Sequence, residues 1–115
     1  MAINVYCIDD EEALCENFAD YFSSQYVTVT TFTDPLIAIE TIKRIQPDLL
    51  FVDYRLPGTN GDEVAQAVAA NIPKFLITGD STVKTKYVFN GIFFKPYRTE
   101  DVQRVIDGFL ISKSA

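Results

Sequence analysis

Short apolar runs and amphipathic segments alternate along the chain about five times. The apolar runs have the length and content of buried parallel strands, and they cover residues 3–8, 27–32, 48–52, 74–78 and 91–94. Segments with helical spacing follow four of them, over about residues 11–24, from 35 to Pro47, through 64–69 and through 102–110. This (βα)5 pattern predicts an α/β fold, a parallel sheet with helices on both faces. No repeat or linker divides the 115 residues, so we expect one domain.

The helical segments each present one apolar face. Asp34-Pro35 is a typical helix start, with an acidic cap followed by proline at the first helical position. The residues that we expect to pack inward are Leu14, Phe18, Tyr21 and Phe22 in the first helix, Ile37, Ile39, Ile42 and Ile45 in the second, Val64, Ala65, Val68 and Ala69 in the third, and Val102, Val105, Ile106, Phe109 and Leu110 in the last. Pro57 to Gly61 is rich in turn formers and predicts a loop.

Polar residues stand where the apolar runs end. Asp9 and Asp10 follow the first run, Asp53 follows the third, Thr78 closes the fourth and Lys95 follows the fifth. The carboxyl ends of parallel strands meet at one edge of an open α/β sheet, where ligands bind. Five chemically active side chains are therefore predicted to meet at one place.

Composition narrows the function classes. The net charge of −6 and a pI near 4.4 argue against nucleic acid as a partner. No apolar stretch approaches the ~20 residues of a membrane span, and the start MAINVYC has no basic leader, so we expect a cytoplasmic protein. Cys7 and Cys15 are then expected to be reduced core thiols. Without histidine, His-dependent triads and the common transition-metal sites are excluded.

The clustered carboxylates indicate the chemistry of the site. Such groups repel one another unless a cation neutralises them, and Mg²⁺ prefers oxygen ligands and often bridges to a phosphoryl group. Lys95 and Thr78 could contact phosphate oxygens. With no histidine and no Gly-rich phosphate loop, the acceptor would itself be a carboxylate, and Asp53 is the best candidate for an aspartyl phosphate.

The ordered set Asp9-Asp10, Asp53, Thr78 and Lys95-Pro96, with DYRLPGTNG from residue 53, resembles the receiver domains of two-component response regulators, which are CheY-like. The resemblance spans essentially the whole chain. It implies a flavodoxin-like, doubly wound sheet with strand order 2-1-3-4-5, Asp53 as phosphoacceptor, and Thr78 and Lys95 as contacts of the phosphoryl group. It also implies Mg²⁺ bound by Asp9, Asp10, Asp53 and the backbone carbonyl of Arg55.

By this resemblance the chain would be a signalling receiver rather than an ordinary enzyme, although it would catalyse its own phosphorylation and dephosphorylation. The expected donor is a histidine kinase or a phosphotransfer protein, and phosphorylation would switch binding to a downstream protein. We expect no nucleic-acid or membrane partner, and a monomer or weak dimer. Only Ser112 to Ala115 follow the last helical pattern, so we expect a stand-alone receiver over 1–115 without an output domain.

Two features depart from the family pattern. Lys95 lies only 17 positions after Thr78, and the β-branched content of the residues between them predicts a short or irregular fourth helix. We hypothesise that the chain does not use the dimer face that this helix usually helps to form. The switching aromatic usually found three residues before the lysine is replaced by Ile92, although Phe93 or Phe94 could substitute.

Alternatives remain open at this point. Asp9 and Asp10 could simply cap a helix. The chain could be a pseudo-receiver that binds proteins without being phosphorylated, although no acid and no lysine of the set is lost. A Mg²⁺-dependent phosphohydrolase or flavodoxin-like enzyme would need a further acid/base or a cofactor loop.

Two further sets of residues each have two possible roles. Arg55 and Asp80 could form a salt bridge across the site that restricts the attacking water, or be an ordinary exposed pair. The aromatic residues near the shortened segment could form a partner surface or repack the core, and they are Tyr87, Phe89, Phe93 and Tyr97.

Overall fold

The computed structural model describes residues 2–114 and contains the predicted parallel sheet. Its five strands are β1 (Ile3–Ile8), β2 (Val27–Phe32), β3 (Leu49–Asp53), β6 (Lys74–Thr78) and β7 (Gly91–Phe94). They pair in the order β2-β1-β3-β6-β7, all in parallel. Strands β4 and β5 form a separate small hairpin, so β6 and β7 are the fourth and fifth strands of the main sheet. The strand order is therefore the predicted 2-1-3-4-5, and the predicted fold class is confirmed.

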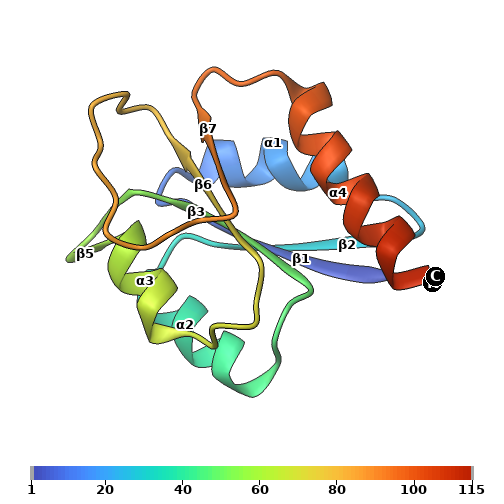
Figure 1. The fold of residues 1–115 in the computed structure, drawn as a ribbon, viewed down its shortest axis with the longest axis horizontal. Coiled ribbons are helices and arrows are strands. Elements are labelled where there is room, and N and C mark those ends of the chain that lie inside the picture. The colour runs from blue at the N-terminus through green and yellow to red at the C-terminus, as the bar shows by residue number, and fades with distance from the viewer. Residues whose placement is uncertain (1, 115) are drawn as a thin grey trace.

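Helices cover both faces of the sheet (Figure 1). The helices α1 (Glu12–Phe22) and α4 (Thr99–Ser114) lie on one face, and α2 (Pro35–Arg44) and α3 (Gly61–Ala67) lie on the other. Each face has its own apolar cluster. Phe18, Phe51 and Ile106 belong to the first cluster, and Ile42, Val52 and Val64 to the second.

The second helix begins as predicted but buries a different face. The Asp34 carboxylate accepts hydrogen bonds from the backbone N–H groups of Leu36 and Ile37, at 2.9 and 3.4 Å. Ala38 and Ile42 are buried, whereas Ile37 and Ile45 are exposed, contrary to the expectation. Ala38 and Ile42 lie four positions apart and form one stripe, so Ile37 and Ile45 lie off this stripe and point to solvent, whereas Ile39 packs partly buried on the second cluster.

The first and third helices also differ in detail from the expected patterns. In α1, Phe18 and Phe22 are buried, but Tyr21 is 57% exposed. Helix α3 ends at Ala67, and Val68 is extended, with a ψ of 164°. Val68 nevertheless remains buried, because its side chain still packs in the second cluster.

A two-residue turn shapes the loop that follows Asp53. Strands β4 (Arg55–Leu56) and β5 (Thr59–Asn60) pair in antiparallel fashion on either side of Pro57 and Gly58. Gly58 has a φ of +71°, a conformation that glycine adopts without strain. Asn60 then caps α3, since its side chain accepts a hydrogen bond from the N–H of Glu63 at 2.9 Å. The turn therefore fixes the path of Arg55 beside the sheet edge.

The sequence predicts a short or irregular fourth helix between Gly79 and Asn90. The structure confirms that this part of the chain is irregular, but it forms no helix at all. Two buried charged residues hold it in place. Asp62 of α3 accepts hydrogen bonds from the N–H groups of Lys86 and Tyr87, at 3.0 and 3.1 Å. The fully buried Lys74 donates from Nζ to Tyr87 Oη at 2.9 Å and to the carbonyl oxygens of Ala69 and Ile72. All three ammonium donors of Lys74 are thus satisfied.

The aromatic residues near this segment mainly repack the core. Tyr87 and Phe89 contact edge to face, with centroids 5.0 Å apart, and Phe89 packs on the second cluster. Phe93 and Tyr97 pack on the first cluster. The exposed apolar side chains here are instead Val88, Ile92 and Phe94.

The remaining expectations concern the cysteines and the membrane. Cys7 and Cys15 are both buried and free, as predicted. Within residues 2–114, no helix is long and apolar enough to span a bilayer.

Gly61 makes a close approach that another residue cannot reproduce. A Cβ at this position would lie 2.8 Å from Leu76 Cδ1 and 2.9 Å from the backbone oxygen of Asp53. We predict that Gly61→Ala lowers the free energy of unfolding by roughly 1–3 kcal/mol, because buried backbone must shift. Urea denaturation measures this change.

Gly108 provides the matched control. It lies in the exposed part of α4, and a Cβ there would meet nothing within 4 Å. Gly108→Ala should raise the free energy of unfolding by about 0.5–1 kcal/mol. If the two substitutions had the same effect, the close approach at Gly61 would be irrelevant to stability.

Candidate functional site

Strand register brings the predicted residues to one edge of the sheet. Ile8 stands opposite Val52, so Asp9, one residue further along, stands beside Asp53. Thr78 stands opposite Phe94, and Lys95 follows directly, with its N–H donating to the Thr78 carbonyl at 2.8 Å. The carboxyl ends of neighbouring parallel strands therefore lie side by side, and the acidic, hydroxyl and cationic groups that follow them lie around the same crevice.

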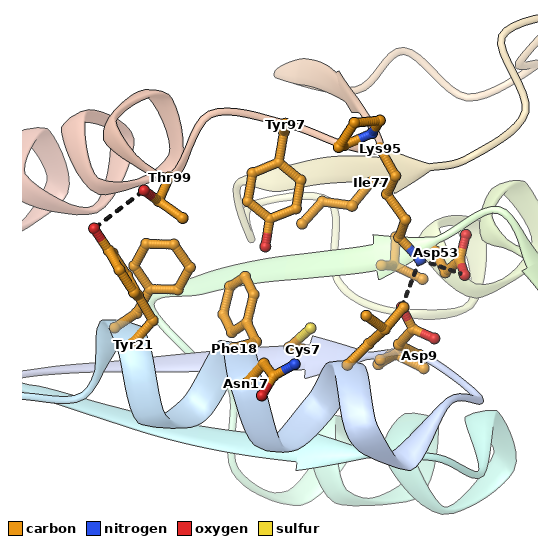
Figure 2. A pocket seen from close by; sticks show the side chains of 15 residues that line it. Cys7, Asp9, Asn17, Phe18, Tyr21, Asp53, Ile77, Lys95, Tyr97 and Thr99 are labelled. Atoms are coloured by element: carbon orange, nitrogen blue, oxygen red, sulfur yellow. Dashed lines mark hydrogen bonds and ion pairs between the residues drawn. The ribbon is translucent and has the colours of Figure 1, made fainter.

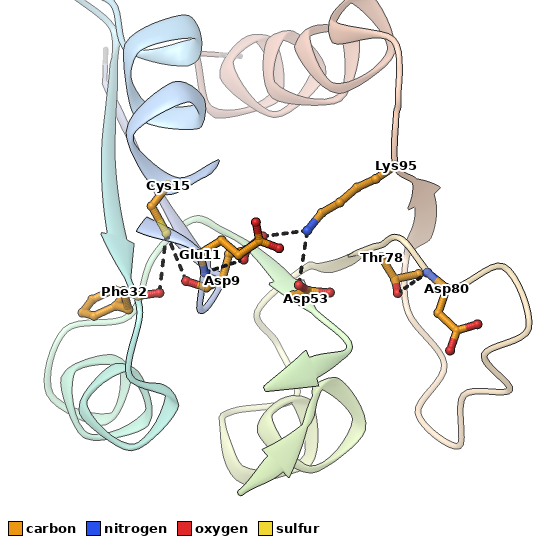
Figure 3. Close-up of polar contacts among 8 residues, drawn as sticks. All are labelled: Asp9, Glu11, Cys15, Phe32, Asp53, Thr78, Asp80 and Lys95. Atoms are coloured by element: carbon orange, nitrogen blue, oxygen red, sulfur yellow. Dashed lines mark hydrogen bonds and ion pairs between the residues drawn. The ribbon is translucent and has the colours of Figure 1, made fainter. Parts of the chain in front are cut away.

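Lys95 is the centre of the polar contacts (Figures 2 and 3). Its Nζ lies 2.8 Å from Asp9 Oδ2 and 3.2 Å from Asp53 Oδ2. Asp9 and Asp53 are only 5% and 8% exposed, so both ion pairs are largely screened from water. One ammonium group thus links carboxylates that are far apart in the sequence.

The three carboxylates form a group suited to a divalent cation. Asp9, Asp10 and Asp53 each offer an oxygen atom, and these atoms all lie within 4.8 Å of one another. Asp10 is exposed, which leaves one side of the cluster open to water. An all-oxygen set of few carboxylates with room for water fits Mg²⁺ better than a transition metal.

Thr78 and Arg55 lie around the same cleft. A cavity of about 440 Å³ is lined by Asp10, Asp53, Arg55, Thr78 and Lys95, among others. The buried Thr78 hydroxyl accepts a hydrogen bond from the N–H of Asp80 at 3.1 Å. A Cβ at Gly79 would meet nothing within 4 Å, so the space beside Thr78 is open.

Arg55 and Asp80 form an ion pair at the mouth of this cleft. The Arg55 guanidinium donates to Asp80 Oδ2 from Nη2 and, at 3.1 Å, from Nε. Asp80 also accepts from the N–H and hydroxyl of Thr82. Hydrogen bonds from Thr82 and Arg55 lower the pKa of Asp80 to about 2. The expected salt bridge is therefore present, although the guanidinium side is largely exposed.

Burial and charge shift two pKa values in the site. Desolvation raises the pKa of Asp53, since the opposing effect of Lys95 does not fully compensate for it and the nearby Asp9 adds repulsion. Burial alone would lower the pKa of Lys95, but its hydrogen bonds to and attraction by Asp9 and Asp53 outweigh burial and raise it. Three carboxylates meet the single ammonium group of Lys95, so the site carries excess negative charge.

The residues near the expected switch position differ in exposure. Ile92 and Phe94 are 42% and 47% exposed, whereas Phe93 packs into the first cluster. Phe94 is the aromatic that stands opposite Thr78 in the register.

Comparison with known proteins decides the family. The family model described as the response regulator receiver domain matches residues 5–107. This chain belongs to the response regulator receiver domain family. The match covers most of the chain and identifies it as a receiver domain of two-component signalling.

Several curated proteins contain segments similar to this receiver. The hybrid signal transduction histidine kinase D of Dictyostelium discoideum is 30% identical over 96% of the chain. The putative two-component response regulator ARR21 of Arabidopsis thaliana is 24% identical over 98%. The chain spans 8% and 20% of the lengths of these proteins.

Solved structures agree on the fold. The signal receiver domain of an HD domain-containing protein from Pseudomonas fluorescens has a TM-score of 0.86 at 16% identity, covering 98% of this chain and 90% of that one. A CheY-like receiver domain from Methylobacillus flagellatus has a TM-score of 0.83 at 15% identity, covering 95% and 99%. At such identities the likeness concerns the fold alone.

Sequence reasoning missed the residues that anchor the irregular segment. Lys74 is the first residue of a run that is otherwise typical of a buried strand. Because a buried lysine needs polar partners inside the protein, this position could have indicated an internal hydrogen-bond network. Asp62 gave no such signal, because acidic residues are common in the first turn of a helix. The contact of the Tyr97 ring with the first cluster also follows only from the fold.

The raised pKa of Asp53 leads to a stability prediction. An acid whose pKa is raised by folding stabilises the protein below its unfolded pKa, and this stabilisation is lost as the pH rises through the folded pKa. We predict that Asp53→Asn is more stable than the wild type at pH 7, by a few degrees in melting temperature, and that the difference shrinks as the pH falls towards 4.

Thermal unfolding at several pH values, without divalent cations, measures this difference. Asp107→Asn, a change in the exposed part of α4, is the control and should be nearly neutral. A destabilised Asp53→Asn at pH 7 would contradict the charge balance described above.

Proposed function

We propose that this chain is the phosphoacceptor receiver of a two-component phosphorelay, in which a phosphohistidine donor transfers a phosphoryl group to Asp53 and so switches the binding of a downstream protein. The single observation that carries the proposal is the convergence of Asp9, Asp10, Asp53 and Lys95 at one sheet edge. The donor would be a histidine kinase or a phosphotransfer protein. All 115 residues would serve as one receiver, located in the cytoplasm with its donor.

Each residue has a distinct role in this proposal. An Asp53 oxygen attacks phosphorus, and the bond between phosphorus and the donor nitrogen breaks. Asp9, Asp10, Asp53 and the Arg55 carbonyl would hold Mg²⁺, which would neutralise charge on the transferring group. Lys95, already 3.2 Å from Asp53, would pair with a phosphoryl oxygen. Thr78 would exchange its bond from Asp80 N–H for one to the phosphoryl group.

The geometry favours this function over a pseudo-receiver. Asp53 is nearly buried but borders an open cleft shared with Thr78 and Lys95. A module that only binds proteins would not require three carboxylates within 4.8 Å of one another, an arrangement that repulsion makes costly without a cation.

Incubation with a small phosphodonor tests the proposal directly. We predict that acetyl phosphate with Mg²⁺ adds one phosphoryl group to the protein, observed by intact mass, as acetate leaves. The addition should disappear with EDTA or with Asp53→Asn. Asp62→Asn controls for the loss of a buried carboxylate outside the site.

Two results would contradict the proposal. The first is no adduct at any Mg²⁺ concentration in protein that is folded by circular dichroism. The second is an adduct of equal yield in Asp53→Asn. Either result would favour the pseudo-receiver.

The ion pair of Arg55 and Asp80 leads to a separate prediction. It borders the cleft that holds Asp53, and we infer that it restricts the approach of the water that would hydrolyse the aspartyl phosphate. We predict that Arg55→Ala speeds dephosphorylation by a few-fold. The decay of the phosphorylated mass after removal of the donor gives the rate.

Arg98→Ala is the matched control for Arg55→Ala. Arg98 is also largely exposed and pairs with Glu100 at 3.2 Å, but it does not line the cleft. Equal decay rates for the wild type and both variants would show that the Arg55 ion pair does not gate water.

A further inference from the structure

A second cavity adjoins the phosphoacceptor on the other side of Lys95. Its volume is about 490 Å³, within the range of small-molecule sites. It lies between α1 and the chain that connects β7 with α4 (Figure 2). Leu14 and Phe18 of α1, Ile77 of β6 and the ring of Tyr97 provide much of its apolar wall.

Polar contacts border this cavity at two ends. At one end the Thr99 hydroxyl donates to Tyr21 Oη at 3.0 Å and ties α4 to α1. At the other end Lys95 joins Asp9 and Asp53. Figure 2 shows Tyr97 and Phe18 projecting into the space between these two bridges. A bound molecule would therefore have an apolar body of limited length and a head near the carboxylates.

The charged residues that line the cavity determine which charge the head group of a bound molecule should carry. The charged residues that line the cavity are Asp9, Asp53 and Lys95, which leaves one unbalanced negative charge, and Asp10 lies within 4.8 Å of both acids. The whole chain carries a net charge of −6. A cationic head is attracted to this end of the cavity and an anionic head is repelled, most strongly when no metal ion is bound.

We propose that this cavity binds a small primary amine with an aryl or alkyl body, and that the ammonium group pairs with Asp9 or Asp53. The amine and Mg²⁺ then compete for the same carboxylates, so each weakens the binding of the other by the same factor. Inhibition of phosphorylation by such an amine would rest on the proposed function. Binding in the cavity would not.

Three probes with one body separate the effect of the head from that of the body. They are 3-phenylpropylamine, 3-phenylpropan-1-ol and 3-phenylpropanoic acid, titrated into the metal-free protein and followed by amide and methyl NMR shifts. We expect saturable shifts at Leu14, Ile77 and Tyr97, and an affinity for the amine about tenfold or more above that for the acid. Mg²⁺ should weaken binding of the amine but not of the alcohol.

Substitution within α1 tests the location. Leu14→Trp fills the cavity and should abolish binding of both the amine and the alcohol. Ala13→Trp places the same side chain at an exposed position of the same helix and should leave binding unchanged. The probe series on the wild type does not depend on either variant folding.

Several results would overturn the proposal. They are equal or tighter binding of the acid in the absence of Mg²⁺, no saturable binding of the amine at millimolar concentration, amine binding that is insensitive to Mg²⁺, and unchanged binding in a folded Leu14→Trp variant. Because the titration needs no phosphoryl group, failure of phosphorylation with acetyl phosphate would leave its outcome unaffected.

Discussion

The ion pairs of Lys95 with Asp9 and Asp53 are the interaction on which the site depends. Burial raises the pKa of Asp53, and Asp9 adds repulsion, so attraction by Lys95 offsets only part of the cost of holding these carboxylates together. The unbalanced negative charge suits a divalent cation beside Asp53 and favours a cationic ligand in the adjoining cavity. The fold therefore maintains an arrangement that is costly on its own and becomes favourable when a positive charge is added.

The rest of the structure holds this arrangement in place. Parallel register sets Asp9 beside Asp53, and the backbone bond of Lys95 to Thr78 fixes where the lysine begins. The segment from Gly79 to Asn90 lacks a helix, yet Asp62 and Lys74 attach it to α3 and to the start of β6. These polar anchors replace the packing that a helix would give. The exposed Ile92 and Phe94 show that the replacement covers the sheet less completely.

Much of this could be predicted from sequence, because strand ends and strand order follow from local patterns. The apolar runs gave all five strands of the main sheet to within a residue, and the five site residues followed from where those runs end. Helix faces were predicted less well. Ile37 and Ile45 are as apolar as Ile42, and only the packing of α2 on the sheet decides that Ile42 is the buried one. The internal bonds of Lys74 and the cavity beside Lys95 depend on contacts between distant segments, which no local pattern encodes.

We propose that the acidic cluster makes Asp53 the phosphoacceptor. Borohydride reduces an aspartyl phosphate to homoserine, so reduction after treatment with acetyl phosphate and Mg²⁺, followed by peptide mass spectrometry, identifies the modified residue. We expect homoserine at position 53, formed only when Mg²⁺ is present. Homoserine at position 9 or 10, or at no position while Mg²⁺ is bound, would contradict it.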